Sequence, residues 1–116
     1  MNDKSVFLRD LVFSSLLNYL NSLGLKRAPF FNMDEVVFMH GDDTRLFLWS
    51  YNGIDPATKN YYPAIMFYTD NNKDDDWKRR ISNSTVLRFC GDEVDKAEKW
   101  QNAVEAVVET IVGARA

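Results

Sequence analysis

Residues 35–51, EVVFMHGDDTRLFLWSY, decide the fold, because their apolar side chains alternate with the two-residue period of a strand. Two such runs, 35–40 and 45–51, flank the turn-forming segment GDDT, and this arrangement predicts a β-hairpin. In the second run the aromatic side chains share one face and the leucines share the other, with Phe47, Trp49 and Tyr51 set against Leu46 and Leu48. Both faces are apolar, so we expect other elements to cover at least one of them.

Two later segments also have the character of strands. Residues 61–69, YYPAIMFYT, are rich in aromatic and β-branched side chains, but Pro63 has no backbone N–H to donate, which predicts a strand that begins near a sheet edge. Residues 85–90, TVLRFC, alternate over a shorter length and are expected to form either a fourth strand or an extended loop. The sequence therefore predicts three to four strands, antiparallel where the connections are short.

The N-terminal region has the period of a helix instead. Between Val6 and Leu23 the apolar side chains recur at spacings of three and four residues, Asp3 can cap the start, and Gly24 offers a left-handed stop. Very little of this helix is polar. We therefore expect it to be mostly buried, either against the sheet or against a second subunit.

A second helix is predicted at the C-terminus, starting at Gly91 and Asp92 and ending at Gly113. It has one apolar stripe and an opposite face of charged residues, which is typical of a surface helix. The predicted fold is therefore α+β: an antiparallel sheet of three to four strands with the N-terminal and C-terminal helices packed on one face, a two-layer sandwich. We expect residues 1–116 to form a single domain.

Residues 69–80, TDNNKDDDWKRR, are dense in possible oxygen ligands and raise the question of a calcium loop. An EF-hand loop that starts at Asp70 has Asp75 where the turn requires glycine and Ile81 where a bidentate glutamate is required. Because both positions have the wrong residue, the segment is not expected to be an EF-hand calcium site. Three aspartates instead precede three bases by four residues, the favourable spacing on a helix: Asp74, Asp75 and Asp76 before Lys78, Arg79 and Arg80. We expect a short helical turn, anchored inward by Trp77.

The sequence offers little material for catalysis. His40 is the only histidine and Cys90 the only cysteine, so a nucleophile and base pair has few possible members. We interpret His40 as a turn residue and Cys90 as a small buried thiol. Cys/His metal sites are excluded by count, and no glycine-rich phosphate loop is present. We expect a protein that is not an enzyme and has no cofactor and no metal.

The same features predict a cytoplasmic protein. The N-terminal residues MNDKSVFLRD carry both charge signs and do not resemble a secretory signal. A single cysteine forms no internal disulfide, and no segment is apolar enough over a sufficient length to span a membrane.

Charge is unevenly distributed along the chain. The net charge is −3, but residues 34–76 contain nine acidic and three basic residues. Acidic loops beside large aromatic side chains favour a protein-binding surface, and we expect it to dock a larger, basic macromolecule, as a small inhibitor, immunity or anti-defence protein does. An alternative interpretation has equal weight: these acidic residues only keep the protein soluble. The predicted contact residues are Asp42, Asp43, Tyr51, Asp55, Tyr61, Tyr62, Asp70, Asp74, Asp75 and Trp77.

The sequence also bears on three other functions. The apolar first helix favours a structural subunit of a viral particle or another homo-oligomer, associating through that helix. Direct binding of nucleic acid is disfavoured, because the basic residues do not gather beside the aromatic strands in the sequence. An enzyme that uses His40 is the least favoured, because His40 has few possible catalytic partners.

Overall fold

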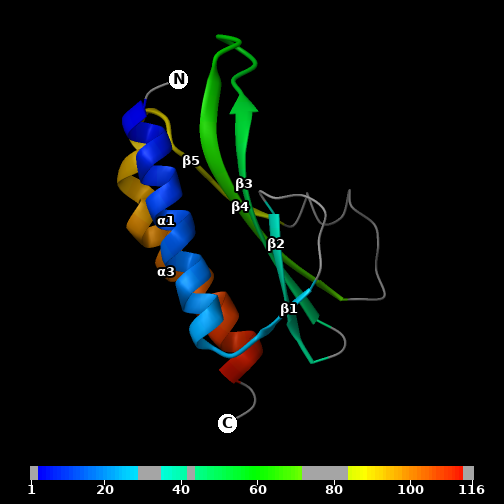
Figure 1. Ribbon diagram of the computed structural model, residues 1–116. Coiled ribbons are helices and arrows are strands. Elements are labelled where there is room, and N and C mark those ends of the chain that lie inside the picture. The colour runs from blue at the N-terminus through cyan, green and yellow to red at the C-terminus, as the bar shows by residue number, and fades with distance from the viewer. Residues whose placement is uncertain (1–2, 29–34, 42–43, 72–83, 114–116) are drawn as a thin grey trace.

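The computed structural model describes residues 3–28, 35–41, 44–71 and 84–113, which form two layers. One layer is a five-stranded sheet, and the helices α1 and α3 lie side by side on one of its faces (Figure 1). In chain order the elements are α1 (Asp3–Ser22), β1 (Lys26–Ala28), β2 (Glu35–His40), β3 (Thr44–Ile54), β4 (Tyr61–Asn71), β5 (Thr85–Arg88), the 3₁₀ helix η1 (Gly91–Lys96) and α3 (Ala97–Val112).

The sheet is an antiparallel meander in the order β1-β2-β3-β4-β5. The longest ladder joins β3 to β4, from Thr44↔Asn71 to Ile54↔Tyr61, and this hairpin projects past the other strands (Figure 1). The α+β class, the antiparallel sheet and the two terminal helices are confirmed. The predicted count of three to four strands is wrong, because the sheet has five.

The extra strand is β1, which pairs with β2 from Lys26↔Met39 to Ala28↔Val37. Its three residues are too few to show an alternating pattern, and two of them are basic. The strand depends on its neighbour: the Arg27 guanidinium lies 5.8 Å from the centroid of the Phe38 ring on β2. The ambiguity over residues 85–90 is also resolved, because β5 pairs with β4.

The start of β4 lies near an edge, as predicted, because the ladder with β5 runs only from Ala64↔Arg88 to Phe67↔Thr85 and leaves the first residues of β4 outside it. Farther along, β4 lies between β3 and β5. Pro63 is tolerated at the start of β4 because its carbonyl accepts the Phe89 N–H at 2.8 Å, one residue beyond the end of β5. At this last rung of the ladder only the carbonyl is required, and the missing N–H costs little.

The core lies between the sheet and the helices. The two leucines of β3 that the alternation placed on one face, Leu46 and Leu48, are both fully buried. They pack with side chains of both helices and of the other long strands: Leu16, Leu20, Phe38, Ile65, Phe67, Leu87, Phe89, Trp100, Val104 and Val108. The leucine face of β3 therefore lies in the core, and its aromatic face lies on the opposite side of the sheet.

The first helix is less buried than its composition predicts. It ends as expected, with Gly24 in the left-handed region at φ 72°, but Phe7 is 64% exposed and Leu11 is 56% exposed. The apolar side chains surround the helix instead of forming one stripe. A single sheet face therefore cannot cover all of them.

Candidate functional site

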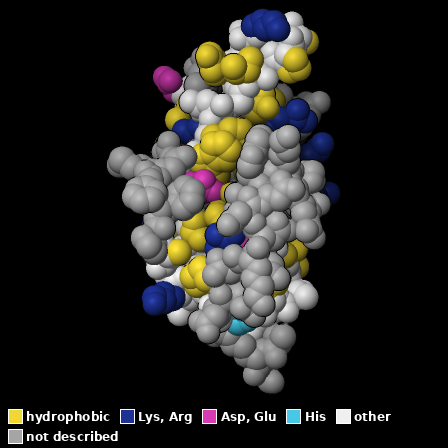
Figure 2. Space-filling model, turned by 90° about the vertical axis from the view of Figure 1, so that its right-hand side faces the viewer, with side chains coloured by type: hydrophobic (Ala, Val, Ile, Leu, Met, Phe, Trp, Pro, Cys, Tyr) yellow, Lys and Arg dark blue, Asp and Glu magenta, His cyan; other side chains and the backbone are white. Residues whose placement is uncertain are grey.

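The sheet face turned away from the helices carries the aromatic side chains of β3 and β4. Directly opposed residues of an antiparallel pair point to the same side, so the register gathers residues from all five strands on this outer face. We call this surface the outer face: Lys26, Ala28, Glu35, Val37, Met39, Arg45, Phe47, Trp49, Tyr51, Tyr62, Ala64, Met66, Tyr68, Asp70, Val86 and Arg88. Figure 2 shows hydrophobic side chains along the middle of this side of the molecule.

One end of the outer face is tied together by its own contacts. Arg45 donates from Nε and Nη2 to the two oxygens of Asp70, at 2.9 and 3.1 Å. The Phe47 and Tyr68 rings stack with centroids 4.5 Å apart, and the Tyr68 hydroxyl donates to Glu35 Oε1. The Asp70 side chain is only 6% exposed. Its carboxylate links β4 to β3 through Arg45 and offers little accessible surface to a partner.

The other end of the outer face combines stacked aromatic rings with two small residues. Trp49 and Tyr51 stack along β3 with ring centroids 4.6 Å apart. Gly53 faces Tyr62 across the ladder, and a Cβ at Gly53 would overlap the tip of the Tyr62 ring. Glycine is therefore required for this ring position. Ala64 lies between Tyr51 and Arg88 in the register, and its short side chain is fully buried.

A pocket of about 670 Å³ lies beside β5, and we call it the edge pocket. Its walls combine three aromatic side chains (Tyr51, Tyr62 and Trp100) with three cationic ones (Arg88, Lys96 and Lys99), together with Val86 and Leu87. Neither lysine forms an ion pair with another described residue. The pocket therefore presents positive charge next to aromatic rings.

Electrostatics link Tyr51 to its neighbours in the pocket. Burial raises the pKa of the Tyr51 hydroxyl above its ordinary value, Tyr62 raises it further, and Arg88 acts in the opposite direction. The phenol is therefore neutral at physiological pH and can donate a hydrogen bond. Trp100 is another donor in the pocket wall: its indole Nε1–H is buried and has no acceptor among the described residues.

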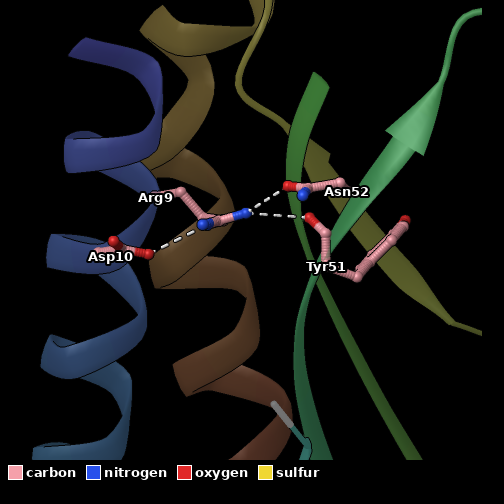
Figure 3. A network of polar contacts seen from close by, with 4 residues as sticks. All are labelled: Arg9, Asp10, Tyr51 and Asn52. Atoms are coloured by element: carbon pink, nitrogen blue, oxygen red, sulfur yellow. Dashed lines mark hydrogen bonds and ion pairs between the residues drawn. The ribbon is translucent and has the colours of Figure 1, made fainter. Parts of the chain in front are cut away.

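Arg9 holds this end of β3 from the helix side (Figure 3). Its Nη1 donates to the Tyr51 carbonyl oxygen at 3.2 Å and to Asn52 Oδ1 at 2.8 Å. Its Nε pairs with Asp10 at 3.1 Å. The Tyr51 backbone is therefore fixed from α1, while its ring points away from Arg9, as Figure 3 shows.

The predicted contact residues do not form one acidic rim in the described parts of the chain. Tyr51 and Tyr62 meet in the edge pocket, whereas Tyr61 lies at the hairpin tip and is 59% exposed. Asp55 organises that tip, because its carboxylate accepts the Ala57 N–H at 2.9 Å. Asp70 lies at the opposite end of β4, about 30 Å away along the strand. These two carboxylates therefore do not act together.

Five other predicted contact residues, Asp42, Asp43, Asp74, Asp75 and Trp77, lie outside the described residues, as does the predicted helical turn. Sequence reasoning missed the cations of the pocket, Arg88, Lys96 and Lys99. No local pattern identifies them, because each is more than twenty residues from the tyrosines they accompany. Only the pairing of β5 with β4 and the packing of α3 bring them together.

The two residues considered for nucleophilic chemistry lie far apart. His40 is at the β2 end of the hairpin that leads to Thr44, whereas Cys90 follows β5 at the other end of the sheet. Cys90 is exposed, so its interpretation as a buried thiol is wrong. Across the described ranges, no three His, Cys, Asp or Glu side chains are grouped as metal ligands are.

No helix among the described residues has the length and apolar content that a membrane span requires. Comparison of the chain with models of known protein families found no match. Comparisons with curated proteins and with solved structures likewise found no similar protein. The function is therefore inferred from the geometry of the outer face and the edge pocket.

Proposed function

We propose that the protein is a non-catalytic binding module that docks a protein partner at the Tyr51 end of its outer face. The observation that carries the proposal is the convergence of Tyr51 and Tyr62, from two strands, on the open edge pocket. A small inhibitor, immunity or anti-defence protein would act in this way, by occupying a functional surface of its target.

The composition of this end suits recognition. Large aromatic side chains that are held in place contribute much of the binding energy at protein interfaces, since they cover a large area and lose little conformational freedom. Trp49 and Tyr51 hold one another by stacking, and Tyr62 is seated over Gly53. The site is therefore preorganised, which reduces the entropic cost of binding.

The predicted acidic contribution remains a separate proposal. Asp55 and Asp70 each have a structural role in the described residues. The remaining acids of the predicted surface are Asp42, Asp43, Asp74 and Asp75. If they contact a basic partner, reversing these four charges weakens its capture. Unchanged capture would remove the acidic loops from the interface.

The proposal is tested by affinity capture from cells that make the protein, followed by measured binding of each purified candidate. We expect Tyr51→Ala and Tyr62→Ala to lose a partner that the wild type retains. Tyr61→Ala is the matched control, because Tyr61 is exposed at the hairpin tip and outside the edge pocket. Equal binding by all three variants would contradict the proposal.

A second function, assembly of copies through α1, is favoured by the exposure of Phe7 and Leu11 one helical turn apart. Light scattering at micromolar concentration tests it directly. If α1 mediates assembly, the wild type forms a stable oligomer and Phe7→Glu with Leu11→Glu returns it to a monomer. A monomeric wild type would exclude this function at that concentration.

A further inference from the structure

The edge pocket lies against an open edge of the sheet. The strand β5 is last in the strand order, and its pairs are all with β4. Within a strand, successive residues turn their backbone N–H and C=O groups to opposite sides. The Phe89 N–H points to Pro63 on β4. Since Leu87 shares this direction, the backbone N–H and C=O of Val86 point away from β4, toward the open edge.

This edge is accessible. The Val86 side chain is 39% exposed, and Thr85 and Arg88 are also exposed. No described residue forms a backbone hydrogen bond with Val86 on the open side of β5. An exposed strand edge of this kind is a template for an added strand. With four residues, β5 gives an added strand about 13 Å of ladder.

The charged side chains that line the pocket beside this edge are positive. Lys96 and Lys99 project from η1 and α3 into the wall of the pocket, and Arg88 lines it from β5. Neither lysine is neutralised by a described carboxylate. A segment that enters here is therefore favoured if it carries acidic side chains, and a basic segment is repelled.

We propose that the edge pocket binds an extended acidic segment of the partner protein, which pairs with the open edge of β5 as a sixth strand. This inference rests on the proposed function and specifies the chemistry of the partner. Main-chain hydrogen bonds to Val86 set the alignment of the segment, while its carboxylates meet Lys96 and Lys99. Tyr51 and Tyr62 contact its apolar side chains on the outer face.

A peptide is favoured over single-stranded nucleic acid for a geometric reason. Nucleic acid is held by a positively charged groove that follows the phosphate backbone, with exposed rings on which bases stack. Three cations, Arg88, Lys96 and Lys99, line a single pocket and do not follow a groove, and Trp100, the largest ring in that pocket, is 8% exposed. The open backbone of β5 adds directional hydrogen bonds that an extended peptide matches.

The test uses the full-length protein and a fluorescein-labelled peptide that alternates glutamate with valine and has capped ends. Fluorescence anisotropy reports binding. Lys96→Glu with Lys99→Glu should weaken it about tenfold or more, and raised salt should weaken it as well. Lys26→Glu is the matched control, because Lys26 is an exposed lysine on the other edge strand, β1.

A second variant tests strand addition itself. Val86→Pro removes the outward N–H but leaves the ladder to β4, since proline is accepted at an edge position whose N–H points outward. We expect it to abolish binding of the glutamate–valine peptide while circular dichroism shows a retained fold. The same loss is expected when backbone N-methyl groups are placed on the peptide in the unmodified protein.

Other outcomes overturn the inference. Failure of the peptide to bind, or binding unaffected by Val86→Pro, would exclude strand addition at β5. Stronger binding of an oligothymidine than of the peptide would assign the pocket to nucleic acid. If a captured partner depends on Tyr51 and Tyr62 but is indifferent to Val86, Lys96 and Lys99, the proposed function stands and this inference alone fails.

Discussion

Replacing Arg9 by methionine tests how much the link between α1 and β3 contributes to stability. Methionine keeps most of the apolar stem and removes the guanidinium, whose side chain is only 13% exposed. The Tyr51 carbonyl then loses a charged donor at 3.2 Å, and Asn52 loses one at 2.8 Å. The Tyr51 carbonyl keeps its partner Ala64 in the β3–β4 ladder, so the loss is that of a second, charged donor. A hydrogen bond to a charged group contributes about 1.5–3 kcal/mol, whereas the contact with exposed Asn52 contributes less.

We therefore expect Arg9→Met to lower the free energy of unfolding by about 2 kcal/mol. In a chain of this length that corresponds to a fall in melting temperature of roughly 8 °C. Thermal and urea denaturation followed by circular dichroism measure both quantities, and the slope of the urea transition should not change.

Asp10→Asn is the control for the charge pair on the same side chain. The Asp10 side chain is 60% exposed, so its pair with Arg9 should contribute no more than about 0.5 kcal/mol. A double-mutant cycle of Arg9→Met with Asn52→Ala isolates the contact to Asn52. The reasoning is refuted if Arg9→Met is as mild as Asp10→Asn, because the link to the Tyr51 carbonyl would then contribute nothing measurable.

Three further outcomes concern the edge pocket. Gly53→Ala should displace the Tyr62 ring and weaken partner binding, while thermal denaturation shows a stability change within about 1 kcal/mol, since the ring can swing outward. Trp100→Phe should change the urea-derived stability by no more than about 1 kcal/mol, because it removes a buried donor that has no acceptor among the described residues. Because the pKa of Tyr51 is raised, its neutral form stabilises the fold fully below about pH 10, and this contribution is lost as pH rises further. Tyr51→Phe should therefore flatten the alkaline decline in urea-derived stability.

Each of these outcomes has a result that contradicts it. Unchanged binding by Gly53→Ala would show that the position of the Tyr62 ring does not matter to the partner. A loss of about 3 kcal/mol or more in Trp100→Phe would mean that packing of the indole outweighs its buried N–H. Tyr61→Phe is the control for the alkaline measurement, because Tyr61 is exposed, and equal curves for the two variants would contradict the assignment to Tyr51.

The local pattern was enough to predict the main elements. The alternation in residues 35–51 is set by the pleat of the strand, and it placed Leu46 and Leu48 in the core and Trp49 and Tyr51 on the other side. The helical period and Gly24 predicted α1 and its left-handed end. These features depend on neighbouring residues, so periodicity and turn chemistry reveal them.

Features that depend on distant residues were missed. The strand β1 has only three residues and is defined by its pairing with β2. The predicted acidic rim failed to form from Asp55 and Asp70 because the long β3–β4 ladder holds them at opposite ends.

Composition and spacing along the chain are enough to predict the class of fold, the aromatic face of the hairpin and the scarcity of catalytic groups. The place where charged residues meet the aromatic face depends instead on tertiary contacts. Tyr51 and Tyr62 lie in the acidic part of the sequence, yet the pairing of β5 and the packing of α3 surround them with Arg88, Lys96 and Lys99. Charge along a chain does not predict charge across a surface, because strand pairing makes neighbours of residues that are distant in sequence.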